Sequence, residues 1–171
     1  MARIGIFFGS DTGNTESIAK MIQKQLGTGV ADVFDIAKSS KEDLEQYDRL
    51  LLGIPTWYYG EAQCDWDDFF PTLEDIDFSS KIVALFGCGD QEDYAEYFCD
   101  AMGTLQGIIE PHGATLVGHW PTTGYHFEVS KGLADDNHFV GLVIDEDRQP
   151  ELTAERVDGW VEQVRKEMNL G

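Results

Sequence analysis

Short apolar runs alternate along the chain with segments in which apolar residues recur every three or four positions. The run 4–8 predicts a buried strand, and Ile18, Ile22 and Leu26 behind it fall on one face of a helix. The same patterns predict strands at 30–36, 50–54, 81–86, 114–117 and 139–144, and helices at 39–44, 65–70, 94–109 and 157–168. Pro71 is expected to end the helix at 65–70. Strands that are apolar on both faces and alternate with helices indicate a parallel sheet with right-handed crossovers.

Residues 118–138 interrupt this alternation. They are rich in Gly, His, Thr and Asp, and they separate the strands predicted at 114–117 and 139–144. Because loops of this length are usually functional or inserted, we interpret the segment as an insertion that splits the last strand. No repeat, linker or second-domain boundary is evident. Residues 1–171 are therefore predicted to form one α/β domain, a three-layer, doubly wound, five-stranded parallel sheet with this insertion in its last strand.

The composition is that of a globular protein. A chain of 171 residues buries roughly 70% of its unfolded surface on folding, so neither a metal nor a disulfide is needed for stability. The three cysteines lack Cys-x-x-Cys spacing, and the four histidines do not cluster at metal-ligand spacing. Met1 leads directly into a strand, and no apolar run reaches the length of a membrane span. We expect a cytoplasmic monomer with reduced thiols and no membrane association.

Charge is the unusual bulk property. The chain has 32 acidic and 12 basic residues, a formal net charge of −20. Between Arg49 and Lys131 the only basic residue is Lys81. The acidic residues of that stretch gather at 61–68, 74–77 and 90–100. Such a surface disfavours binding to nucleic acid or anionic membrane and favours basic protein partners, although part of the charge serves solubility.

The turn between the first strand and the first helix is rich in hydroxyl and amide side chains. Its residues are Ser10, Asp11, Thr12, Gly13, Asn14 and Thr15. Backbone N–H groups and the positive end of the helix dipole converge at such a turn, which suits an anion. No Lys or Arg lies between Arg3 and Lys20, so a bound phosphate would be held by neutral donors. The spacing excludes a Walker A loop and a dinucleotide fingerprint, but an ordinary helix cap fits this loop equally well when it is taken alone.

Two further loops carry aromatic residues beyond predicted strand ends, where open α/β sheets bind their ligands. After 50–54 come Pro55, Thr56, Trp57, Tyr58, Tyr59 and Gly60, and after 81–86 come Gly87, Cys88, Gly89, Asp90, Tyr94 and Tyr97. Trp and Tyr pair well with planar rings, although they also pack on each other or on a core. A phosphate cradle beside aromatic walls predicts a site for a mononucleotide with a large ring system.

With these motifs the chain resembles the flavodoxins, which are electron carriers that bind FMN. The resemblance rests on Ser-x-Thr-Gly-x-Thr at 10–15, on Trp57 and Tyr94, and on Gly-x-Gly-Asp at 87–90. It runs from Arg3 to Met168; residues 54–60 are similar to the enterobacterial type, and the segment 118–138 to the long-chain class. Flavodoxins have strand order 2-1-3-4-5 with FMN at the switch between strands one and three, and the resemblance implies the same here.

The resemblance also implies roles for matching positions. The FMN phosphate would be bound by the loop Ser10, Asp11, Thr12, Gly13, Asn14 and Thr15. Trp57 and Tyr94 would flank the isoalloxazine ring, and backbone groups of Tyr58, Tyr59, Cys88, Gly89 and Asp90 would bind its polar edge. The remaining expected contacts are Pro55, Thr56, Gly60, Tyr97, Cys99 and Asp147.

The implied function is electron transfer without substrate turnover, between an NADP-dependent flavodoxin or ferredoxin reductase and iron–sulfur or radical enzymes docked on the acidic face. The uncompensated phosphate, the acidic residues at 61–68 and 90–100 and the aromatic walls all oppose the addition of electrons, so a strongly reducing flavin is expected. Many flavodoxins have a glycine beside flavin N5 whose peptide flips on reduction. Here the pair is Tyr58-Tyr59, which predicts an altered flip.

Two other functions share this fold class. An FMN-dependent quinone or nitro reductase needs a second-substrate pocket, and no motif of the sequence points to one. A receiver-type signalling domain needs an acidic pair after strand one, an Asp after strand three and a Lys after the last strand. These places hold Gly9-Ser10, Pro55-Thr56 and Asp145-Glu146, which excludes the signalling function.

Overall fold

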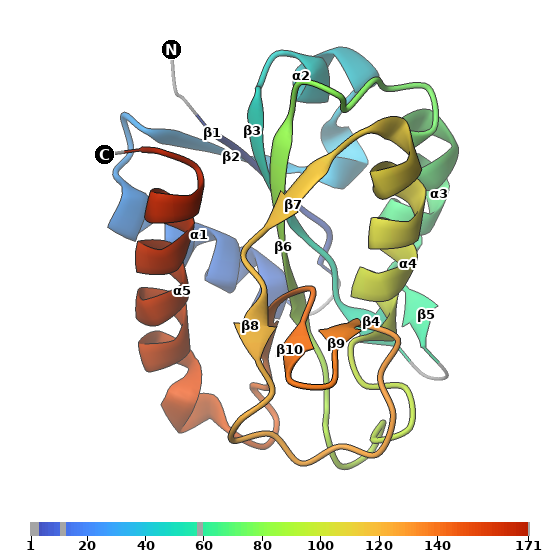
Figure 1. The fold of residues 1–171 in the computed structure, drawn as a ribbon, viewed down its shortest axis with the longest axis vertical. Helices are drawn as coiled ribbons and strands as arrows, with labels where there is room; N and C mark the ends of the chain where they lie inside the picture. The colour runs from blue at the N-terminus through green and yellow to red at the C-terminus, as the bar shows by residue number, and fades with distance from the viewer. Residues whose placement is uncertain (1–3, 11–12, 58–59, 171) are drawn as a thin grey trace.

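The computed structural model in Figure 1 describes residues 4–10, 13–57 and 60–170, with only the backbone of Trp57. Its main sheet contains β1 (Ile4–Phe8), β2 (Ala31–Asp35), β3 (Arg49–Gly53), β6 (Ile82–Cys88), β7 (Thr115–Val117) and β11 (Gly141–Ile144). The strand order is β2-β1-β3-β6-β11, with β7 also paired to β6, and every pairing is parallel. The predicted order 2-1-3-4-5 is confirmed.

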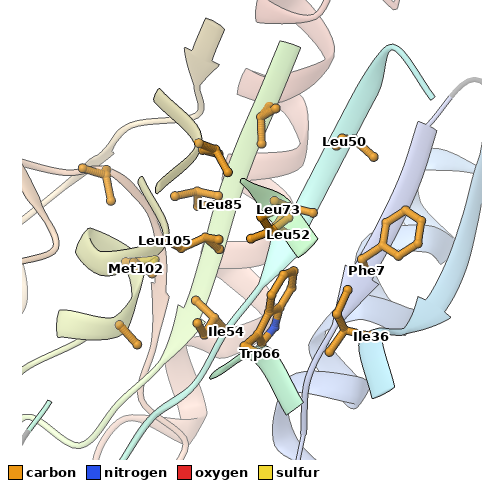
Figure 2. Close-up of a cluster of buried hydrophobic side chains, with 14 of the residues drawn as sticks. Phe7, Ile36, Leu50, Leu52, Ile54, Trp66, Leu73, Leu85, Met102 and Leu105 are labelled. Atoms are coloured by element: carbon orange, nitrogen blue, oxygen red, sulfur yellow. The ribbon is translucent and has the colours of Figure 1, made fainter. Parts of the chain in front are cut away.

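Helices cover both faces of this sheet, as predicted. In Figure 1, α1 (Asn14–Leu26) and α5 (Thr153–Glu167) lie on one side, and α3 (Cys64–Leu73) and α4 (Asp100–Ile109) on the other. Alternate residues of one strand therefore enter different cores: Ile4 and Ile6 pack with α1 and α5, whereas Phe7 belongs to the opposite core. Figure 2 shows the core under α3 and α4, where Leu52 and Leu85 lie with Trp66. Burial on both faces explains the continuous apolar runs.

The short helix α2 (Lys41–Glu45) begins with the predicted cap. Ser40 Oγ accepts from the Asp43 N–H (3.4 Å), and the Ser40 N–H donates to Asp43 Oδ2 (2.8 Å), which completes a capping box. Helix α3, in contrast, does not end before Pro71 but continues to Leu73. Trp66, Phe69 and Leu73 are buried along one face of this helix, and that burial outweighs the single hydrogen bond that Pro71 cannot donate.

Helix α4 begins at Asp100, so the prediction of a helix from Tyr94 is wrong for its first turns. The backbone at 95–98 pairs with the later segment 128–129: the Ala95 carbonyl accepts from the Glu128 and Val129 N–H groups (2.8 and 3.0 Å), and the Phe98 N–H donates to Val129. Cys99 then turns the chain with a φ of 54°. A tertiary pairing has replaced the hydrogen bonds that a helix would have made.

Strands β7 and β11 share one position beside β6. β7 pairs with residues 82–84 of β6, and β11 pairs with residues 85–88. Between them lies a small antiparallel sheet that the sequence pattern did not predict, formed by β8 (Trp120–Pro121), β10 (His138–Phe139) and β9 (Leu133–Asp135). Buried Tyr125 holds this segment to the main sheet, because its hydroxyl donates to the Val143 carbonyl (2.6 Å). No helix among the described residues is long and apolar enough to span a bilayer.

Candidate functional site

A pocket opens where the loops after β1, β3, β6 and β11 meet, at the carboxyl edge of the sheet. The chain leaves β1 through α1 on one side of the sheet and leaves β3 toward α3 on the other side, which opens a crevice between the two loops. The residues lining the pocket are Ser10, Asn14, Thr15, Pro55, Thr56, Cys88, Gly89, Asp90, Tyr94, Glu146 and Asp147. All of these except Glu146 are expected site residues from the sequence. The fold thus brings the predicted loops together in one place.

The amino end of α1 forms one side of the pocket. The residue in the cap position is Gly13 (φ 92°), which has no side chain, and its own N–H donates to Ser10 Oγ (2.9 Å). Thr15 in the first turn is buried, and its Oγ1 donates to Cys88 Sγ (3.5 Å) at the end of β6. An ordinary capping interaction is therefore disfavoured for this loop. The first N–H groups of α1, which have no acceptor within the helix, begin at Asn14 on the pocket wall.

The loop after β3 forms a second side. Thr56 is buried, and its Oγ1 accepts from the Ala101 N–H of α4 (3.0 Å), which fixes this loop relative to the helix. β4 (Thr56–Trp57) pairs antiparallel with β5 (Glu61–Ala62) in a short hairpin. Gly60 in the turn has a φ of 85°, a conformation that favours glycine. The hairpin therefore starts at the pocket wall and returns towards α3.

The loop after β6 is shaped by the Asp90 side chain. Asp90 Oδ1 accepts from the N–H groups of Glu92 and Asp93 (3.0 Å each), and the Asp90 carbonyl accepts from the Tyr94 N–H (3.1 Å). This turn places the half-buried Tyr94 on the pocket wall. The neighbouring Cys88 thiol stays neutral at physiological pH, because burial raises its pKa to about 12.

The loop after β11 is organised by Asp145, which is fully buried. Its Oδ1 accepts from the N–H groups of Asp147 (3.1 Å) and Arg148 (3.0 Å), which turns the chain past the pocket. Its Oδ2 accepts from the backbone N–H and the side-chain amide of Gln91, each at 2.9 Å. Asp145 thereby ties the loop after β11 to the loop after β6.

Arg148 adds a second tie between these loops and changes the electrostatic picture. Its Nε, Nη1 and Nη2 contact Asp90 (3.0 Å), Glu92 (2.9 Å) and Asp93 (3.0 Å) respectively. The acidic residues at 90–100 are expected to add negative potential, and one guanidinium compensates part of that charge because it contacts three of them. Burial opposes ionisation of Asp90, but hydrogen bonds from Arg148 and from the Asp93 and Glu92 N–H groups lower its pKa overall.

Asp147 has the opposite shift. Its pKa is raised by burial and then by the negative charges of Asp90 and Asp145. The pocket wall therefore has three acidic side chains, Asp90, Glu146 and Asp147, and the described lining includes no Lys or Arg. Neutral donors come from the β1 side and negative charge from the β6 and β11 side.

The other expected residues lie around or outside this pocket. Tyr97 lines a separate hollow with residues 92–96 and Glu128, and Cys99 is buried at the start of α4. Gly13 and Gly60 lie in the turns beside the pocket. Asp11, Thr12, Tyr58, Tyr59 and the side chain of Trp57 fall outside the described residues. Within the described part of the chain, no three His, Cys, Asp or Glu residues are placed to hold a metal ion.

Sequence reasoning missed Glu146, Asp145 and Arg148. Glu146 could have been found from its place beside Asp147, directly after a strand that is apolar on both faces. Arg148 also carried a signal, because it is the only basic residue between Lys131 and Arg156. Asp145 had none beyond its place at the end of that strand.

The sequence profile of the family described as Flavodoxin matches residues 6–160. The chain belongs to the flavodoxin family. Flavodoxin 1 of Escherichia coli K12 is 82% identical over 170 residues, which cover 99% of this chain and 97% of that protein. The flavodoxin of Haemophilus influenzae is 71% identical over 170 residues, covering 99% of this chain and 98% of that protein. This flavodoxin is therefore close to the enterobacterial type.

Solved flavodoxin structures agree with the fold. The crystal structure of Fusobacterium nucleatum flavodoxin bound to flavin mononucleotide superposes with a TM-score of 0.91 at 35% identity, covering 98% of this chain and 99% of that chain. Oxidised flavodoxin 2 of Bacillus cereus superposes with a TM-score of 0.73 at 27% identity, covering 97% and 99% of the two chains. The flavodoxin-like α/β fold expected from the sequence is confirmed.

Proposed function

We propose that this flavodoxin holds one FMN in the pocket between the loops after β1, β3, β6 and β11, and that it carries single electrons at low potential. As a flavodoxin it is an FMN-binding electron-transfer protein, not an enzyme with substrate turnover of its own. The observation that carries the placement is the convergence of the amino end of α1, Thr56 and Tyr94 on one pocket at the switch between β1 and β3.

The β1 side of the pocket fits a phosphate. Ser10, Asn14 and Thr15 supply hydroxyl and amide donors beside the amino end of α1. No atom of the described residues lies within 4 Å of the place where a Cβ would project from Gly13, so the backbone there is open to a ligand. We assign the phosphate to this loop, including Asp11 and Thr12, where N–H groups and the helix dipole favour an anion without a Lys or Arg.

The opposite side fits a planar ring. Tyr94 is held on the wall by the turn that Asp90 builds, and Gly89 also lines the pocket. We assign Trp57 and Tyr94 to the two faces of the isoalloxazine ring, and backbone groups of Tyr58, Tyr59, Cys88, Gly89 and Asp90 to its polar edge. We count Pro55, Thr56, Gly60 and Asp147 as further contacts, with Tyr97 and Cys99 behind the wall.

The charges on the wall support a low potential. Bound FMN supplies the one-electron chemistry, and the protein adjusts how readily it accepts electrons. Asp90, Glu146 and Asp147 line the pocket, and the pKa of Asp147 is raised by partial burial and by the negative charges of Asp90 and Asp145. Adding electrons to a bound flavin increases negative charge beside these carboxylates, which the surroundings oppose. We therefore expect a strongly reducing flavin.

The same acidic character supports basic redox partners. We propose that an NADP-dependent flavodoxin or ferredoxin reductase delivers electrons, and that iron–sulfur or radical enzymes receive them, each docking on the acidic face. We also place this flavodoxin in the cytoplasm as a monomer, in keeping with its three thiols outside any disulfide. Electron transfer from a reductase, followed by stopped-flow absorbance, should slow as salt rises; rates independent of salt would contradict the docking proposal.

Titration and potentiometry test the central proposal. FMN added to the apoprotein should bind at one equivalent with quenched flavin fluorescence, and the second reduction step should lie below that of free FMN. Neutralising the wall with Glu146→Gln and Asp147→Asn together should raise that potential. Glu42→Gln on α2 at the opposite end of the sheet (Figure 1) is the matched control and should leave it unchanged. A second step no lower than that of free FMN would overturn the low-potential proposal.

A further inference from the structure

Arg148 occupies an unusual position for a lone basic residue in an acidic region. Each of its three guanidinium nitrogens contacts a different carboxylate, at Asp90, Glu92 and Asp93, over 2.9–3.0 Å. The Asp90 side chain is 9% exposed, whereas those of Glu92 and Asp93 are 67% and 68% exposed. One end of this cluster is therefore buried at the pocket wall, and the other end lies in solvent.

The cluster joins the two loops that carry the negative side of the pocket. Arg148 directly follows the lining residues Glu146 and Asp147, and Asp90 lies four residues before Tyr94. The Asp145–Gln91 hydrogen bonds connect the same loops but are fully buried. The two connections differ in kind. Asp145–Gln91 is a buried anchor, whereas the Arg148 side chain is one-third exposed and open to exchange with solvent and salt.

The positive charge of Arg148 also affects the electrostatic potential of the pocket. Arg148 is a cation held directly beside a wall whose described lining has carboxylates but no Lys or Arg. It cancels part of the negative potential at the edge where the loop after β6 meets the loop after β11. Without it, Asp90 would lose the hydrogen bond that most strongly favours its ionised form, and Glu92 and Asp93 would be unpaired beside it.

We propose that Arg148 is a positioning residue for the flavin site: it clasps the Tyr94 loop in its binding conformation and limits how far the acidic wall lowers the reduction potential. This inference rests on the proposed placement of FMN in this pocket. It separates two effects of one side chain. The three guanidinium contacts hold the loop, and the positive charge keeps the reduction potential of the flavin from falling further.

Arg148→Gln tests both effects. FMN is expected to dissociate roughly threefold to tenfold faster, as suits the loss of a partly exposed ion-pair network, and the reduction potential should become more negative. Arg148→Lys keeps the positive charge but cannot contact all three carboxylates in the same way. FMN should therefore dissociate faster from it, while its reduction potential stays close to that of the wild type. Lys41→Gln on α2 removes the same charge at the other end of the sheet and should change neither quantity.

The outcomes separate this inference from the proposed function. If the wild type does not bind FMN, the proposed function fails first. If the wild type binds FMN and Arg148→Gln matches Lys41→Gln in dissociation rate and potential, the Arg148 inference alone is wrong. A lower melting temperature with unchanged rate and potential would also contradict it, because that pattern shows a purely structural role. If Arg148→Gln fails to fold, FMN dissociation from the wild type is measured in 1 M NaCl instead. The Debye length there is about 3 Å, so the ion pairs of Arg148 are screened. An unchanged dissociation rate at high salt would show that these ion pairs do not hold the loop.

Discussion

The buried carboxylate of Asp145 accepts two hydrogen bonds from Gln91, one from its backbone N–H and one from its side-chain amide, each 2.9 Å long. Gln91 Oε1 in turn accepts from the His126 N–H (2.6 Å). The Asp145 side chain thus links the loop after β11 to the loop after β6 and, through Gln91, to the segment between β8 and β9. This relationship explains how irregular loops can present a defined pocket wall.

Replacing Asp145 should therefore destabilise the fold as well as the pocket. Asp145 is fully buried and accepts from four N–H groups, so Asp145→Ala leaves two buried and two partly buried donors without this acceptor. We expect the free energy of unfolding to fall by about 2–4 kcal/mol, measured by urea denaturation of the apoprotein. Asp136→Asn, at an exposed position, is the control and should change it by less than about 0.5 kcal/mol. Equal stability of the two variants would show that the network contributes little.

Gly53 marks a close approach at the end of β3. A Cβ at this position would lie 2.4 Å from the ring atoms of Phe86 on the neighbouring strand. Gly53→Ala should cost roughly 1–3 kcal/mol through overpacking and should also weaken FMN binding, because Ile54 and Pro55 follow directly. Gly29→Ala has open space around its Cβ and should be nearly neutral. Chemical denaturation of both variants decides the matter, and a neutral Gly53→Ala would mean that Phe86 moves aside easily.

The three thiols should differ sharply in reactivity. Burial raises the pKa of Cys88 to about 12, and burial also raises that of Cys99 well above its usual value, whereas Cys64 is exposed. Because the thiolate is the reactive form, a disulfide reagent at pH 8 should modify only Cys64 in the folded apoprotein. Cys64→Ser should abolish the fast phase, and unfolding in urea should restore two reactive thiols. Fast modification of Cys88 in folded Cys64→Ser would contradict its raised pKa.

Asp100 should make stability depend on pH. Burial raises its pKa, and the hydrogen bond from the Lys131 N–H (2.7 Å) offsets only part of that effect. A raised pKa in the folded state means that the stabilisation is complete below the unfolded value, near 3.8, and is lost as pH rises through the folded value. Asp100→Asn cannot ionise, so its stability relative to wild type should increase with pH over that window. Urea midpoints of both proteins from about pH 4 to 7 check this, and a constant difference would refute the assignment.

The two-sided cores were predictable because they follow from local patterns, whereas the strand order was implied only by the resemblance to the flavodoxins. The runs at 4–8 and 50–54 are apolar on both faces, and only a covered parallel sheet accommodates several such strands. The start of α4 was not predictable in this way. Residues 94–99 have a helical pattern, but the Ala95 carbonyl and the Phe98 N–H bond to residues 128–129, about thirty positions later. Local periodicity contains no information about such a partner.

The candidate site likewise has some features that follow from local sequence and others that depend on distant contacts. Most of its lining residues could be named from the sequence because hydroxyl, glycine and aromatic residues follow predicted strand ends, where ligands bind. Asp147 was implied only by the resemblance, and Glu146 was missed. The electrostatics of the site could not be predicted in this way, because they depend on Arg148 meeting Asp90 across 58 positions of sequence. Counting acidic residues along the chain treats 90–93 as unpaired charge, whereas the fold places a guanidinium among them. Residue types along the sequence therefore predict the position of a ligand site better than its electrostatic potential.

Ser10 should contribute to binding of the phosphate and not of the ring. It lines the pocket beside the amino end of α1, and its Oγ accepts from the Gly13 N–H (2.9 Å). Ser10→Ala should weaken FMN binding about tenfold, in keeping with the loss of hydrogen bonds to a charged group. Riboflavin has the same ring without the phosphate, so its affinity should be equal for wild type and Ser10→Ala. Fluorescence titration of both apoproteins with both ligands gives the four dissociation constants. If Ser10→Ala weakens FMN and riboflavin equally, the hydroxyl shapes the whole pocket and the phosphate must be held elsewhere.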